Sequence, residues 1–100
     1  MTEKPLNELL YKISLRATAG RMDVPITHLT MDSRQVRPGS LFVAVRGTVT
    51  DGHQFIDRAI DQGAAAVLCE ELPAQPVDTV TYVQVDNTAR ALGFVAAYFY

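Results

Sequence analysis

Two polar segments of this chain carry groups that could bind a small molecule. They are Asp32-Ser33-Arg34 and the segment from Gly47 to Gly52. Ser33 has a hydroxyl that can donate and accept hydrogen bonds, and Gly47 would let a ligand approach the main chain. Amides just before a helix that starts near Asp51 would form a slightly positive cradle for an anion. Together these groups favour binding of a polar, partly anionic ligand.

The same residues also have a purely structural interpretation. Asp32 can cap a turn, Ser33 can hydrogen-bond its own main chain, and Gly47 can be a turn glycine. Asp51-Gly52-His53 can be the start of a helix and nothing more. From the residues alone, both interpretations stand.

Motifs of several common catalytic sites are absent from the chain. It contains no GxxxxGK[ST] phosphate loop, no GxGxxG, no CxxC, no HExxH and no GxSxG. His28 and His53 are distant in sequence, and no cysteine cluster accompanies them. These absences argue against ATP hydrolysis, dinucleotide binding, serine hydrolysis and a metal site within these residues.

Two predicted strands bring the polar segments together. The span 28–31 alternates polar and apolar side chains, which predicts a strand that ends at Asp32. The span 41–45 is apolar throughout, which predicts a strand buried on both faces that ends before Gly47. Ligands of parallel sheets bind beyond the carboxyl ends of the strands, so both segments are expected at one edge of the sheet.

The other expected elements complete an α/β fold. Pro38-Gly39 has the chemistry of a type II turn, and Gly63 lies where the C-terminal cap of a helix is expected. Strand, helix and strand in that order indicate a parallel βαβ unit. Three helices are expected: a short opening helix with Leu6, Leu9, Leu10 and Ile13 on one face, a helix after Asp51 with the apolar stripe Phe55, Ile56, Ala59 and Ile60, and a last helix from about Thr88 with Leu92, Val95, Ala96 and Phe99 on one side. Two further strands are expected over 64–68 and 80–85. The span 14–25 is a connection with room for a short edge strand.

Composition indicates one ordinary globular domain over residues 1–100. The chain is 48% hydrophobic and 20% charged with a net charge of −2, so we expect no nucleic-acid and no membrane partner. Arg34, Arg37 and Arg46 are either solvated surface charges or groups near an anionic ligand. The single cysteine, Cys69, excludes an internal disulfide and is expected in a half-buried, structural position. Because no segment reads as a signal peptide or a membrane span, a cytoplasmic protein is expected.

The ordered series of motifs resembles the N-terminal domain of the Mur ligases. The resemblance spans roughly residues 28–69 and rests on Asp32-Ser33-Arg34, Val36, Pro38-Gly39, Leu41-Phe42-Val43-Ala44, Gly47, Asp51-Gly52-His53, Phe55-Ile56, Ala59-Ile60, Gly63-Ala64 and Ala66-Val67. Two members share this pattern: the ligase that adds the third residue of the peptidoglycan stem peptide and the ligase that adds the terminal dipeptide. The spans 82–87 and 89–92 and the closing Phe99-Tyr100 resemble the first more closely.

This resemblance implies a small, mostly parallel sheet flanked by helices that holds the uridine diphosphate end of UDP-N-acetylmuramoyl-L-alanyl-D-glutamate. Its partners would be the central and C-terminal domains of the same three-domain ligase, and the last helix, which lacks a stop signal, agrees with truncation from a longer chain. ATP and magnesium would bind downstream, so no cofactor and no catalytic residue is expected here. ATP would activate a substrate carboxylate as an acyl phosphate, which the amine of meso-diaminopimelate or L-lysine would attack.

The resemblance also implies five substrate-binding residues, namely Met31, Ser33, Thr48, Val49 and Thr50. Relatives often have His-Gln-Ala where this chain has Thr48 to Thr50, so main-chain contacts are expected from this loop. Main-chain donors and acceptors with one hydroxyl suit the polar edge of uracil. Arg34 stays outside the predicted site because an acidic neighbour can pair with it.

Two alternatives remain at this point. The chain could be the same domain of the dipeptide-adding ligase, with a different acceptor. It could also be a non-catalytic scaffold module that has lost nucleotide binding, an interpretation that the changed loop Thr48 to Thr50 supports.

Overall fold

Strands and short helices alternate along the chain. The computed structural model describes residues 3–47 and 49–100. The elements in chain order are β1 (Lys4–Pro5), α1 (Leu6–Leu9), β2 (Ala17–Ala19), β3 (Pro25–Ile26), β4 (His28–Thr30), the 3₁₀-helix η1 (Ser33–Gln35), β5 (Ser40–Val43), the 3₁₀-helix η2 (Gly52–Phe55), α2 (Ile56–Asp61), β6 (Ala66–Cys69), β7 (Thr81–Gln84) and α3 (Thr88–Phe99).

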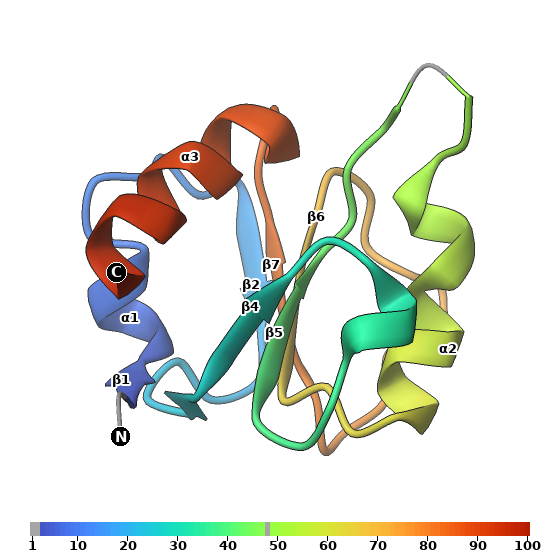
Figure 1. The fold of residues 1–100 in the computed structure, drawn as a ribbon, viewed down its shortest axis with the longest axis horizontal. Coiled ribbons are helices and arrows are strands. Elements are labelled where there is room, and N and C mark those ends of the chain that lie inside the picture. Colours follow the sequence, from blue (N-terminus) through green and yellow to red (C-terminus); the bar gives the residue numbers. More distant parts are fainter. Residues whose placement is uncertain (1–2, 48) are drawn as a thin grey trace.

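A five-stranded sheet with the order β2-β7-β6-β5-β4 forms the centre of the fold. The strands β4 to β7 pair in parallel, and β2 joins β7 in antiparallel orientation at one edge. Helices α1 and α3 cover one face of the sheet, and α2 covers the other (Figure 1). A separate two-stranded pairing joins β1 to β3. The predicted α/β class, with a mostly parallel sheet flanked by helices, is confirmed.

Both faces of the sheet are buried, which explains the continuous apolar runs. In β5, Leu41 and Val43 belong to the core under α1 and α3, whereas Phe42 belongs to the core under α2. In β6, Ala66 and Leu68 alternate in the same way with Val67 and Cys69. A strand covered by helices on both sides needs apolar residues at every position, so the interpretation of these runs as buried strands is confirmed.

Glycines with positive φ form two of the predicted turns. Gly39 has φ +89°, and the amide of Ser40 donates to the carbonyl of Arg37 over 3.0 Å, as in a type II turn. Gly63 has φ +104° and follows the end of α2. The amides of Gly63 and Ala64 close that helix by donating back to Ile60 and Ala59, which is a Schellman motif.

Two predictions of detail differ from the structure. The opening helix is a single turn, because the main chain already leaves the helical conformation at Leu10, although Leu6, Leu9 and Leu10 are buried as expected. Cys69 is fully buried rather than half-buried, because both faces of β6 are covered. Among the described residues, no helix combines the length and apolar character that crossing a membrane requires.

Candidate functional site

A cavity of about 610 Å³ lies beyond the carboxyl ends of β4 and β5. Its wall comes from the turn after β4, from the loop after β5 and from the start of the helical segment that follows. Figure 1 shows η1 and α2 on the same side of the sheet. The prediction that the two polar segments meet at one edge is confirmed. The lining residues are Met31, Asp32, Ser33, Arg34, Val45, Gly47, Thr50, Gly52, Phe55 and Arg58.

A hydrogen bond to its main-chain carbonyl holds Ser33 in place, and its hydroxyl is not needed for this contact. Its residue is 5% exposed, and its carbonyl accepts from the side-chain amide of Gln62 over 2.6 Å. Every buried side-chain nitrogen or oxygen of the described residues has a partner, yet residues 3–47 and 49–100 provide no hydrogen bond to the Ser33 hydroxyl. Ser33 lines the cavity, and a hydroxyl there can donate to and accept from a ligand.

Asp32 and Arg34 form hydrogen bonds and an ion pair with each other. The Asp32 carboxylate caps η1 by accepting from the Arg34 amide over 2.9 Å, and it also accepts two bonds from the Arg34 guanidinium over 3.1 and 3.0 Å. The guanidinium and the amide hold the pKa of Asp32 below its usual value. The interpretation of Arg34 as internally paired is confirmed.

Amides of the loop after β5 donate hydrogen bonds within the protein. The Gly47 amide donates to the Thr50 carbonyl over 2.9 Å, and the Gly52 amide donates to the Val45 carbonyl over 2.8 Å. The amide of His53 donates to the Asp51 carboxylate over 2.9 Å. The prediction that free amides before this helix form an anion cradle is therefore wrong at these positions. These amides already donate hydrogen bonds within the turn and to its cap.

His53 is also engaged within the protein. Its Nδ1 lies 2.7 Å from an Asp51 carboxylate oxygen, and its Nε2 accepts from the Glu70 amide over 2.9 Å. The hydrogen bonds of Asp51 to His53 lower the pKa of this carboxyl group. Within the described part of the chain, no group of three or more His, Cys, Asp or Glu side chains could hold a metal ion.

Arg58 is the basic lining residue without a carboxylate partner in the described part of the chain. Its guanidinium carbon lies 5.9 Å from the centroid of the Phe55 ring, within the range of a cation–π contact. Phe55 lines the cavity as well. An anionic ligand group in the cavity could therefore pair with Arg58 without displacing a carboxylate.

The five predicted substrate residues fall into three groups. Met31, Ser33 and Thr50 line the cavity, and Met31 is 53% exposed at its rim. Val49 is 92% exposed and is outside the lining. Thr48 lies outside the described residues.

Sequence reasoning missed three lining residues, which are Val45, Phe55 and Arg58. Val45 and Phe55 had been assigned to the core alone. The spacing from Phe55 to Arg58 was the available signal, because residues i and i+3 lie on the same side of a helical segment.

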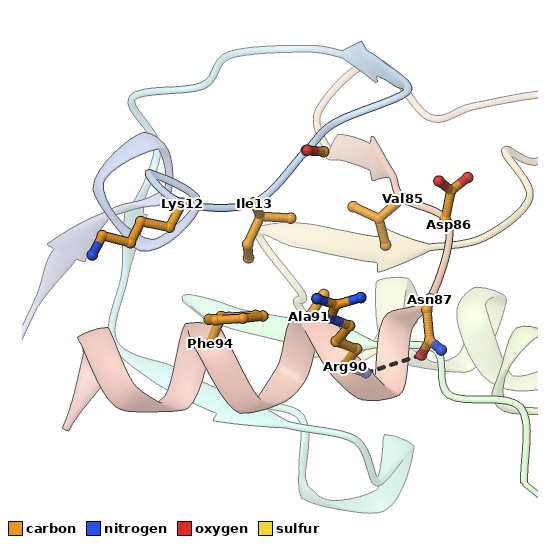
Figure 2. A pocket seen from close by; sticks show the side chains of 9 residues that line it. Lys12, Ile13, Val85, Asp86, Asn87, Arg90, Ala91 and Phe94 are labelled. Carbon is orange, nitrogen blue, oxygen red and sulfur yellow. Dashed lines mark hydrogen bonds between the residues drawn. The ribbon is translucent and has the colours of Figure 1, made fainter.

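A smaller cavity of about 280 Å³ lies between α3 and the segment that leads into β2. Figure 2 shows Arg90 and Phe94 extending from α3 towards Ile13 and Val85. Two of its polar side chains are already engaged, because Asp86 pairs with Arg16 over 2.6 Å and Asn87 accepts from the Arg90 amide over 3.0 Å. The larger cavity contains three of the predicted binding residues, Met31, Ser33 and Thr50, and is therefore the candidate site.

Comparison with known sequences points to one family. The family model described as "Mur ligase family, catalytic domain" matches residues 25–100. A protein of Cytophaga hutchinsonii named UDP-N-acetylmuramoyl-L-alanyl-D-glutamate--2,6-diaminopimelate ligase is 48% identical over 96 residues, which cover 95% of this chain and 20% of that protein. The chain thus spans about a fifth of the length of this relative.

Solved structures share the fold. MurF from Acinetobacter baumannii superposes with a TM-score of 0.82 at 21% identity, over 96% of this chain and 21% of that one. The MurF ligase from Thermotoga maritima in complex with ADP gives a TM-score of 0.60 at 33% identity, over 69% of this chain and 16% of that one.

Proposed function

The chain belongs to the Mur ligase family, and we propose that it binds the uridine diphosphate end of a UDP-N-acetylmuramoyl peptide. The observation that carries this proposal is the cavity beyond β4 and β5, which Met31, Ser33 and Thr50 line. We keep Thr48 and Val49 in the proposed site as main-chain contacts to the bound substrate. Binding, rather than catalysis, is the proposed role of these residues.

The lining matches the chemistry of a uridine nucleotide. Met31, Val45 and Phe55 offer apolar surface for the faces of the base. The Ser33 hydroxyl can donate to or accept from the polar edge of uracil. Arg58 offers a positive charge for a phosphate group beside the base.

We propose that the complete ligase joins 2,6-diaminopimelate to UDP-N-acetylmuramoyl-L-alanyl-D-glutamate. The name of the Cytophaga relative supports this choice, at 48% identity. Likeness to the dipeptide-adding MurF of Acinetobacter at 21% identity concerns the fold alone. The relative's greater length supports central and C-terminal domains as partners of a domain formed by residues 1–100.

The reaction would draw its energy from ATP with magnesium, bound outside these residues. The ADP in the Thermotoga relative supports the nucleotide. We place this ATP-dependent ligase in the cytoplasm, as the sequence predicts.

A titration followed by amide NMR tests the proposed binding. The chain is titrated with UDP-N-acetylmuramoyl-L-alanyl-D-glutamate, with UDP and with ATP. We expect saturable shifts in spans 31–34 and 45–58 with both uridine ligands and none with ATP. Residues around the smaller cavity, such as Ile13 and Phe94, serve as internal controls and should not shift.

Two serine variants test which cavity binds the nucleotide. Ser33→Ala should weaken binding of UDP by about 1 kcal/mol or more, the scale of one lost buried hydrogen bond. Ser14→Ala, at the smaller cavity, should leave the dissociation constant unchanged. No shifts with any uridine ligand at millimolar concentration would contradict the proposal and favour a scaffold module.

A further inference from the structure

His53 lies between two partners that determine its protonation state. A main-chain amide can only donate, so the Glu70 amide, 2.9 Å away, requires an unprotonated Nε2. The proton of the neutral ring is then on Nδ1, which donates to the Asp51 carboxylate over 2.7 Å. The side chain is only 13% exposed, so few water molecules can replace either partner.

Asp51 connects this imidazole to the loop that lines the cavity. Residues Arg46 and Asp51 form an isolated antiparallel bridge across the base of the loop, and the Arg46 guanidinium lies 3.5 Å from the Asp51 carboxylate. The next residue, Gly52, donates to the Val45 carbonyl over 2.8 Å. Movement of Asp51 would therefore displace Gly47, Thr50 and Gly52, which all line the cavity.

Glu70 connects the imidazole to a fixed part of the fold. It follows β6 directly, and its carbonyl accepts from the Gln84 side chain of β7 over 3.0 Å. Its carboxylate accepts from the Thr88 amide at the start of α3 over 2.9 Å. The second partner of His53 is thus attached to two strands and a helix, which makes it a rigid anchor.

We propose that His53 is a positioning residue, which as the neutral Nδ1–H imidazole holds Asp51, the residue before η2, against the end of β6 and so shapes the nucleotide cavity. This inference rests on the proposed function, because its effect is measured as affinity for uridine nucleotides. His53 itself is outside the cavity lining. Its role differs from helix capping, which the Asp51 carboxylate performs for the His53 amide.

Protonation of the ring would break this arrangement. An imidazolium has no acceptor, so its Nε2–H would point at the Glu70 N–H. The Arg46 guanidinium lies within 3.6 Å of the carboxylates of Asp51, Glu70 and Glu71, so both residues that contact the ring are paired with this arginine. The neutral ring with its proton on Nδ1 is therefore the form that binds both partners.

The unmodified chain provides the first test. Nitrogen-15 spectra of the imidazole should show Nδ1–H and an unprotonated Nε2 at neutral pH. The Glu70 amide signal should show the hydrogen bond to Nε2 that the 2.9 Å contact requires. A ring protonated on Nε2 at neutral pH would overturn the proposal.

Substitutions provide the second test. His53→Gln keeps a donor and an acceptor but not the ring that presents them in opposite directions to Asp51 and Glu70, so the affinity for UDP should fall about fivefold to tenfold. His28→Gln is the matched control, because His28 starts β4 at the opposite end from the cavity, where its Nδ1 lies 3.3 Å from the Arg37 guanidinium. Its affinity should equal that of the unmodified chain.

The outcomes separate this proposal from the proposed function. If the unmodified chain binds UDP and folded His53→Gln binds it equally well, the positioning role fails and the nucleotide site stands. If the unmodified chain binds no uridine ligand, the proposed function fails. The amide shifts of Gly47 and Gly52 in His53→Gln then decide the positioning role, since unchanged shifts overturn it and large shifts support it.

Discussion

Three arginines near the candidate site differ in what surrounds them. Arg34 is bound by Asp32 at two points. Arg46 lies within 3.6 Å of carboxylates of Asp51, Glu70 and Glu71. For both, a ligand phosphate would compete with anions already in place. Arg58, by contrast, contacts the Phe55 ring and faces the cavity without a carboxylate partner in the described chain.

Arg58 should therefore distinguish phosphorylated from unphosphorylated ligands. We expect Arg58→Gln to weaken binding of UDP by about 1.5 kcal/mol, the scale of a hydrogen bond to a charged group, and to leave binding of uridine nearly unchanged. Isothermal titration calorimetry with both ligands measures the difference. Arg90→Gln, on the opposite face of the sheet, is the control. Equal losses for uridine and UDP would show that Arg58 acts on the base or on the fold instead.

At the scale of elements, two aspartates shape the walls of the cavity. Asp32 begins η1 and Asp51 begins η2, and each accepts from the main-chain amide two residues later. Both carboxyl groups have a lowered pKa, Asp32 chiefly through the Arg34 side chain and Asp51 chiefly through the His53 amide. The same bonds that order the loops therefore make the folded state sensitive to acid.

The direction of this acid sensitivity follows from linkage. A carboxyl group whose pKa is lower in the folded chain stabilises that fold above its unfolded value, near 3.8, and this contribution is lost as the pH falls through the folded pKa. Asp51→Asn should therefore lower the urea midpoint at pH 7 and reduce the further loss at about pH 3. Asp78→Asn, in an exposed loop, should preserve the acid response of the unmodified chain. An unaltered acid response in Asp51→Asn would contradict this assignment.

Gly52 permits the close approach of the loop to the end of β5. A Cβ at this position would lie 2.8 Å from the Val45 nitrogen and 2.9 Å from its oxygen, and both are main-chain atoms that cannot rotate away. Gly52→Ala should reduce the free energy of unfolding by about 1–3 kcal/mol and weaken UDP binding, because the cavity wall must shift.

The control for this change lies in α3. Among the described residues, a Cβ at Gly93 would meet no atom within 4 Å outside its own stretch of helix. Gly93→Ala should therefore stabilise the chain by roughly 0.5–1 kcal/mol through helix propensity and leave binding unchanged. Urea unfolding and calorimetry measure both variants. Tight UDP binding by Gly52→Ala would exclude this loop from the site.

At the scale of the whole molecule, the sheet separates two apolar cores. Leu6, Leu9, Val95 and Phe99 belong to the core under α1 and α3, and Ile56 and Ala59 to the core under α2. Cys69 lies at the end of β6, between β5 and β7, and is fully buried. Burial raises the pKa of its thiol to about 11.

Cys69 should therefore report on global unfolding. At about pH 8 the thiol is protonated as well as inaccessible, so a thiol reagent should label the native chain slowly, at a rate that follows the population of unfolded molecules. Adding urea should accelerate labelling in parallel with the loss of circular dichroism. Rapid labelling without denaturant would mean that the edge of the sheet opens locally. Cys69→Ala is the reagent blank.

Much of this fold was predictable because its signals are local. Continuous apolar runs marked β5 and β6, and Asp51, Gly63 and Asn87 marked helix ends through short-range hydrogen bonds. The rule for parallel sheets then placed Ser33 and Thr50 at one edge, and the structure brings both to one cavity. The antiparallel β2 was only an open possibility, because its pairing with β7 joins residues far apart in sequence.

The sequence by itself determined the α/β class, the family and the edge of the sheet where the site lies, since each depends on the order and periodicity of residue types. Only the tertiary structure decided which polar groups remain available there. Arg34 and the amides of Gly47 and Gly52 form hydrogen bonds within the protein, whereas Ser33 lines the cavity with no side-chain hydrogen bond to the described residues. His53 acquires its role from Glu70, which lies 17 residues away in sequence. A hydrogen bond requires a short distance between two atoms, and for residues far apart in sequence that distance depends on the folded chain. Local patterns of residue types do not show it.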